Sequence, residues 1–279
     1  MGSESRNISF ITLNSKKRFR ISMKNYHVDM KNGSVRTDTL QSEFVREIYK
    51  MVDPMVGLAK YTLDSTKYMA AGKEKFQNWT FAKGAEFYNT LYSIELDKYY
   101  EVLEKCSDSQ TKFYPTLEEC FDKYPKLPSV YLLFMQILDI ISFDSYLSLV
   151  NTHLRGSNIT KEYTKLEELS RKNTGIGAGK YSDTSCYYND DFYVRLIGSG
   201  VYQENECWIF DYYAEPSSVF VKDTKSGRSK NSKSIYSGRL YVRKEDGECV
   251  CGEMNENVVP IGKSGNFVNR RVVLEMEES

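Results

Sequence analysis

The sequence predicts an α+β protein in which β-strands at both ends of the chain flank a helical middle. Residues 8–36 alternate apolar and polar side chains, as half-buried strands do. Between residues 37 and 174, apolar residues recur every three or four positions, which is typical of helices. After residue 175, short segments rich in β-branched and aromatic residues return, separated by Gly, Asn and Ser.

The N-terminal segment, residues 1–36, is predicted to form β-hairpins. Phe19, Ile21 and Met23 alternate with basic and polar residues, and residues 8–13 and 26–30 repeat this pattern. The pair Asn32-Gly33 predicts a hairpin turn, because both residues tolerate positive φ. Hairpins of this size are not stable alone. We therefore expect them to pair with the C-terminal strands.

The middle segment, residues 37–174, is predicted to be helical. Leu40, Phe44 and Ile48 share one helical face, and Pro54 marks the end of that helix. A capping box formed by Thr116 and Glu119 predicts another helix start. Together the expected helices cover residues 40–52, 55–71, 81–106, 116–121, 128–144 and 160–173.

The C-terminal segment, residues 175–279, is predicted to be β-rich and to form one unit with residues 1–36. Its expected strands are residues 192–197, 207–213, 218–221, 235–243, 248–254 and 267–276. A polar, basic loop at residues 223–234 lies between two of them. The expected architecture is an antiparallel sheet or sandwich built from both chain ends, and a separate helical subdomain is the alternative.

The composition favours self-association. Lys plus Arg and Asp plus Glu both number 38, so the chain has no net charge to oppose assembly or to attract nucleic acid. Tyrosine is abundant at 22 residues; this reflects either an AT-rich genome or contact surface, since Tyr offers an apolar face with a polar tip. Adjacent strand residues face opposite sides. One member of each pair should therefore be exposed for self-association, among the candidates Tyr187, Tyr188, Tyr212 and Tyr213.

The chain shows no expected membrane span and no signal region near its start. Its longest apolar run, residues 130–143, is too short to cross a bilayer and contains Asp139. Six cysteines are too few for a disulfide scaffold in a chain of this size. We therefore expect a cytoplasmic protein.

Candidate metal and cofactor motifs are incomplete, and we expect no cofactor. Residues 175–180 end in Gly-Lys but are one residue short of a phosphate loop and follow a predicted helix, so they indicate a connector. Zinc binding remains an alternative for Cys186, Cys207, Cys249 and Cys251, although their spacing does not match that of common zinc sites. The run Asn189-Asp190-Asp191 with Asp211 could hold magnesium, but such a run is more often a turn.

These patterns favour a non-enzymatic structural or self-assembling protein that forms homo-oligomers. In composition it is similar to Tyr-rich viral coat or occlusion-crystal proteins. Nucleic-acid binding is the alternative, because basic residues could contact phosphates. The candidates for this are Arg18, Arg20, Lys222, Lys225, Arg228 and Lys230. A metal-dependent hydrolase is the second alternative; its only histidines are His27 and His153.

Overall fold

The computed structural model describes residues 13–53, 56–80, 83–84, 86–92, 159–167, 169–171, 185–222, 226–262 and 265–277. These residues form one 12-stranded antiparallel sheet and contain no α-helix. The strands are β1 (Lys16–Asp29), β2 (Val35–Asp53), β3 (Val56–Met69), β4 (Gln77–Asn78), β5 (Glu86–Tyr92), β6 (Thr164–Lys165), β7 (Cys186–Tyr188), β8 (Phe192–Tyr202), β9 (Asn205–Lys222), β10 (Ser229–Arg243), β11 (Cys249–Pro260) and β12 (Asn266–Glu277).

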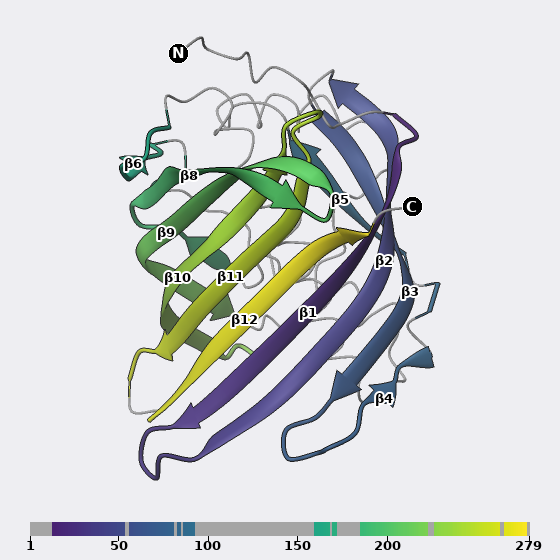
Figure 1. Cartoon of the computed structure of the whole chain (residues 1–279). Helices are drawn as coiled ribbons and strands as arrows, with labels where there is room; N and C mark the ends of the chain where they lie inside the picture. Colours follow the sequence, from purple (N-terminus) through teal and green to yellow (C-terminus); the bar gives the residue numbers. More distant parts are fainter. Residues whose placement is uncertain are drawn as a thin grey trace.

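The sheet joins the two ends of the chain. Its strand order is β4-β3-β2-β1-β12-β11-β10-β9-β8-β6, while β5 pairs with β3 and β7 pairs with β9. The central pair is β1 with β12, whose register runs from Arg18 opposite Glu277 to Asp29 opposite Asn266. Figure 1 shows that the long strands twist strongly and that the sheet curls around its inner side. The N-terminal hairpin and the C-terminal strands therefore lie in one sheet.

The predicted fold class, α+β with a helical middle segment, is wrong. The helices expected over residues 40–52 and 55–71 are the strands β2 and β3, and the helix expected from residue 160 contains β6 and a turn. Part of the helix expected over residues 81–106 is β5. The helices expected over residues 116–121 and 128–144 lie outside the described residues. The six segments predicted as C-terminal strands lie in the five strands β8 to β12, except residue 248; the segments 207–213 and 218–221 form the single strand β9.

The two faces of the sheet differ in polarity. Phe19, Ile21 and Met23 of β1 are buried, and their face is here called the inner face; Arg18, Arg20 and Lys24 alternate with them on the outer face. Cross-strand neighbours continue the inner layer, for example Phe44 of β2, whose ring stacks on Phe19 with centroids 5.5 Å apart. Burial of this apolar layer provides the main stabilisation of the sheet.

The strand connections gather at two opposite ends of the sheet. The basal end carries the β1–β2 turn (residues 30–34), the β11–β12 connection (residues 261–265) and the start of β10. The apical end carries the start of β1, the end of β12, the β8–β9 turn (residues 203–204) and the β10–β11 turn (residues 244–248). In Figure 1 the β1–β2 turn and the start of β12 lie together at the lower left.

The close packing around one glycine of the sheet can be tested by adding a side chain at that position. A Cβ added to Gly238 of β10 would lie 1.8 Å from the backbone oxygen of Glu253 and 2.5 Å from the Tyr212 hydroxyl, which donates a hydrogen bond to that oxygen. We expect Gly238→Ala to reduce the free energy of unfolding by about 3 kcal/mol, because the backbone must move. Gly198→Ala, where a Cβ meets nothing within 4 Å, is the matched control. Equal urea midpoints for the two variants would contradict the described register of β9, β10 and β11.

Candidate functional site

Most described cations at the apical end lie beside carboxylates, Lys50 being an exception. Arg18 pairs with Asp64 at 2.6 Å and Arg20 with Glu277 at 2.5 Å on the outer face. Lys16, Lys60 and Lys244 also lie within 4 Å of glutamates. Exposed pairs like these contribute little to stability. They do, however, leave no uncompensated positive charge on these side chains.

A buried ionic cluster lies beside them, on the inner side of the same end. Arg46 pairs with Glu248 at 2.6 Å, and only 3% and 2% of these two side chains are exposed. Lys17 contacts both Glu248 and Asp246, at 2.8 and 3.3 Å, and Arg243 holds Asp246 at 2.6 Å. Each buried charge therefore has a partner, as low-polarity surroundings require.

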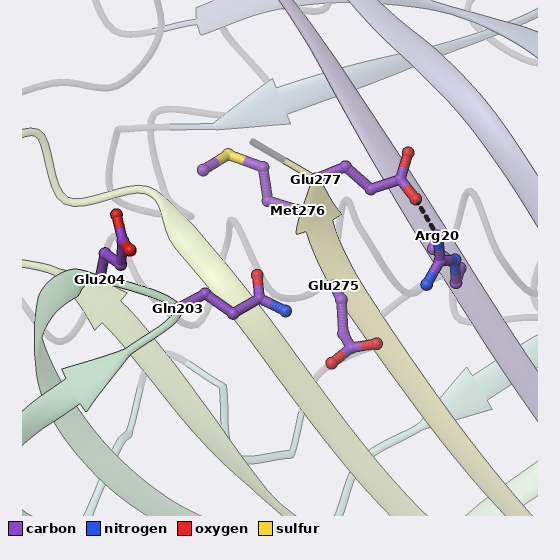
Figure 2. A pocket seen from close by; sticks show the side chains of 6 residues that line it. All are labelled: Arg20, Gln203, Glu204, Glu275, Met276 and Glu277. Atoms are coloured by element: carbon purple, nitrogen blue, oxygen red, sulfur yellow. Dashed lines mark hydrogen bonds and ion pairs between the residues drawn. The ribbon is translucent and has the colours of Figure 1, made fainter. Parts of the chain in front are cut away.

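A surface hollow of about 470 Å³ also lies at the apical end. Figure 2 shows Gln203 and Glu204 of the β8–β9 turn on one side and Glu277, directed toward Arg20, on the other. Glu275 and Met276 complete the lining, and Glu275 accepts a hydrogen bond from the Tyr202 hydroxyl. Three carboxylates against one guanidinium give this hollow an acidic character.

Cations at the basal end are not neutralised in this way. At this end Lys31, Arg36, Arg228 and Lys230 form no ion pair with another described residue. Lys24 and Arg271 form none either, but they lie opposite each other in the middle of β1 and β12. Two carboxylates near them, Asp38 and Glu256, are buried and already have partners. A third, Asp29 at the end of β1, is partly exposed and accepts a hydrogen bond from the Lys31 N–H at 2.9 Å. Although the whole chain has no net charge, the described part of its basal end therefore carries more positive than negative charge.

Exposed apolar side chains lie among these cations. Met30 is 66% exposed, Ile261 63%, Val35 55%, Ile235 48% and Val259 44%. Val35 and Phe267 flank Val28 on the outer face, and Val259 lies opposite Lys233. The two turns are tied together, since the Met30 N–H donates to the Gly265 carbonyl at 2.7 Å. The five exposed side chains are called the basal patch below.

A polar row crosses the inner face just above the basal patch. Asn25 lies between Asp38 and Arg270 in the register, and Arg270 lies opposite Glu256. Arg270 donates to Glu256, which also accepts a hydrogen bond of 2.9 Å from Tyr187. Burial, followed by the charge of Glu256, raises the pKa of Tyr187 well above its ordinary value. Tyr187 is therefore a neutral donor that fixes Glu256 in place.

The candidate basic residues are divided between the two ends. Arg228 and Lys230 lie at the basal end, and Lys222 ends β9 there. Arg18 and Arg20 lie at the apical end, where both are ion-paired. Lys225 lies outside the described residues. The structure therefore does not bring the six residues into one site.

The four candidate tyrosines are also divided. Tyr187 and Tyr212 are buried in the core, whereas Tyr188 is exposed. Tyr213 lies on the outer face, where its ring stacks on Tyr193 with centroids 4.9 Å apart. Each adjacent pair has one inner and one outer member, but the two outer members lie apart, one on β7 and one on the middle of β9. This geometry gives no support to the expected self-assembling or viral coat role.

The candidate metal ligands do not form a site. The described residues contain no group of His, Cys, Asp and Glu that could hold a metal ion. The four cysteines are free thiols, and burial raises the pKa of Cys251 to about 12. Asp191 pairs with Lys165 and Arg171, whereas Asp211 pairs with Arg195 and Arg239. His153 and residues 175–180 lie outside the described residues.

The basal patch was not predicted from the sequence. Its strongest members, Met30 and Ile261, lie in strand connections, where polar residues are usual. Each has a lysine close by in the sequence, Lys31 beside Met30 and Lys263 near Ile261. Apolar residues beside lysines in the strand connections could therefore have indicated the basal patch from the sequence.

Comparisons with known proteins assign this chain to no family. No family model matches the chain, and no curated protein does. Among solved structures, lipovitellin gives a TM-score of 0.40 at 10% identity, covering 94% of this chain and 25% of that one. A DUF1329 family protein from Desulfovibrio piger gives 0.18 at 9% identity over 94% and 87% of the two chains. OmpT of Vibrio cholerae gives 0.21 at 6% identity over 95% and 100%.

This chain thus spans about a quarter of the lipovitellin chain. These TM-scores are too low to indicate a shared fold, so none of the three structures informs the function. No helix in the described part of the chain is long and apolar enough to cross a membrane.

The apical cluster predicts a pH dependence of stability. Burial alone would raise the pKa of Asp246, but hydrogen bonds from Arg243 and the Glu248 N–H, with the charge of Lys17, hold it well below its ordinary value of 3.8. A lowered pKa stabilises the fold above the unfolded-state pKa, and this contribution is lost as the pH falls through the folded-state value.

We therefore expect Asp246→Asn to be less stable than the native protein at pH 7, with a difference that shrinks below about pH 4. Urea midpoints across this range measure the difference. Glu245→Gln, at an exposed position on the same turn, is the control and should have little effect. A difference that stays constant down to about pH 2 would show that the charge of Asp246 is not responsible.

Proposed function

We propose that the protein is a non-enzymatic protein that binds the surface of anionic lipid membranes through its basal end. The observation that carries this proposal is the basal patch itself. Its exposed apolar side chains come from the β1–β2 turn, the β11–β12 connection and the neighbouring strands, and unpaired cations surround them. This combination is typical of proteins that dock on a membrane without crossing it.

The two kinds of side chain contribute different parts of the binding energy. Full burial of a side chain such as Met or Ile contributes about 1.5–3 kcal/mol. Each Lys or Arg near an anionic lipid surface adds about 1 kcal/mol, and this part weakens with salt. Neither the apolar nor the electrostatic contribution gives stable binding alone, and the basal end supplies both.

The acidic hollow at the apical end supports the same orientation. Glu204, Glu275 and Glu277 would be repelled by an anionic surface, whereas the basal cations would be attracted to it. The expected cytoplasmic location fits this proposal, because the cytoplasmic leaflet carries the anionic lipids.

Nucleic-acid binding shares the cations but not the apolar side chains. Interfaces with nucleic acid are strongly basic and polar, and they give no favourable place to a protruding Met30 or Ile261. The lipid surface is therefore the better match to the whole basal end. Binding of a polyanion that does not depend on the apolar residues would favour nucleic-acid binding.

The proposal is tested by sedimentation with vesicles of phosphatidylcholine and phosphatidylserine. We expect the double variant Met30→Ser, Ile261→Ser to bind at least about tenfold more weakly, which corresponds to roughly 1.4 kcal/mol and thus to partial loss of two apolar insertions. The matched control is Ile197→Ser, Val201→Ser, which removes two exposed apolar side chains from β8, away from the basal end.

Native binding should also fall as salt rises, and the control should bind like the native protein. Equal binding by the basal variant and the control would contradict the proposal. If the native protein binds RNA but no vesicles, and the basal variant binds RNA equally well, nucleic-acid binding replaces membrane binding as the proposed function.

A further inference from the structure

A histidine with a fixed ring lies beside the basal patch, on the inner face. The Nε2 atom of His27 is 2.5 Å from Oδ2 of Asp38, and Asn25 donates to the other oxygen of Asp38 at 2.8 Å. The Asp38 side chain is 9% exposed, whereas that of His27 is 42% exposed. A buried carboxylate thus holds the ring while its other edge faces outward.

Asp38 is itself held in place by packing. Tyr68 is buried near it, and the Tyr68 ring lies 4.7 Å from the ring of Trp79. Burial, followed by the charge of Asp38, raises the pKa of Tyr68, so this neighbour stays neutral. With Nε2–H given to Asp38, Nδ1 of His27 is left for an outside partner, and a protonated imidazole donates from both nitrogens.

Arg36 lies directly opposite His27 on β2, so both side chains leave the same face of the hairpin. Cross-strand neighbours of this kind have Cβ atoms about 4.5–5.5 Å apart, close enough for both to contact one small anion. Arg36 is exposed and forms no ion pair with another described residue. Lys31, in the adjoining turn, adds a second cation beside Arg36.

We infer that His27 and Arg36 form a subsite for a phosphate monoester carried by a lipid headgroup. The guanidinium offers two parallel N–H donors, and the imidazolium form of His27 offers a third through Nδ1–H, which matches the three terminal oxygens of a monoester. A phosphodiester, as in phosphatidylserine, has two of its oxygens esterified and offers fewer acceptors. This inference rests on the proposed membrane docking and names the lipid class that the same end prefers.

The depth of the pair supports a lipid source. His27 lies three residues before Met30, which corresponds to about 10 Å of extended strand. Apolar side chains of surface-bound proteins enter about 5–10 Å into the boundary between headgroups and acyl chains. With Met30 inserted, His27 and Arg36 would therefore lie at the level of the headgroup phosphates.

The test compares phosphatidylcholine vesicles that contain phosphatidic acid with vesicles of matched surface charge that contain phosphatidylserine. We expect the native protein to prefer phosphatidic acid by about tenfold. The variant His27→Gln, Arg36→Gln should lose this preference and still bind the phosphatidylserine vesicles. The control Arg228→Gln, Lys230→Gln removes two other exposed basal cations and should weaken binding to both vesicles by the same factor.

Four results would overturn the inference. If the native protein shows no preference, or if the His27 and Arg36 variant weakens both kinds of binding equally, the pair contributes charge alone and membrane docking stands without the subsite. If millimolar glycerol 3-phosphate displaces the native protein from phosphatidic acid vesicles, the ligand is a soluble phosphate ester. If neither vesicle binds the native protein, the proposed function fails together with the subsite.

Discussion

The pairing of β1 with β12 is the constraint on which the rest of the structure depends. It joins strands from the two ends of the chain, with Arg18 opposite Glu277 and Asp29 opposite Asn266. Because side chains alternate along a strand, a shift of one residue would turn Phe19 and its inner neighbours out of the core. The same register places the turn of Met30 beside that of Ile261. The basal patch therefore exists only when this pair has formed.

The sheet also separates charge between its ends, although the composition is neutral. At the apical end, most described arginines and lysines are matched by carboxylates, several of them in the buried cluster around Glu248. At the basal end, the buried carboxylates Asp38 and Glu256 are committed to Asn25, His27 and Arg270 inside the sheet, and Asp29 accepts a hydrogen bond from the Lys31 N–H. The exposed cations there form no ion pair with another described residue, and apolar side chains lie between them.

The sequence predicts the hairpin at Asn32-Gly33 and the C-terminal strands correctly, because alternation and turn residues are local signals. It fails at β2, where Leu40, Phe44 and Ile48 are spaced by four, a spacing that fits a helix face and one side of a strand equally. The inner positions between them hold Ser42 and Arg46. Ser42 is buried against Thr66, and Arg46 against Glu248, which is 202 residues away. Partners so distant cannot be found from a single sequence.

The candidate site was predicted only in part. Arg228 and Lys230 of the basal end were predicted as nucleic-acid contacts, but the zero net charge of the chain concealed the concentration of cations around them.

The depth of the basal patch in a membrane tests the central claim most directly. Ile261→Trp places an indole in the basal patch, and Glu204→Trp places one at the opposite end, beside the apical hollow. The native Trp79 and Trp208 give the same background in both variants. On anionic vesicles with brominated acyl chains, the account predicts quenching of the added fluorescence for Ile261→Trp and none for Glu204→Trp. Equal quenching of both, or quenching at position 204 alone, would contradict it.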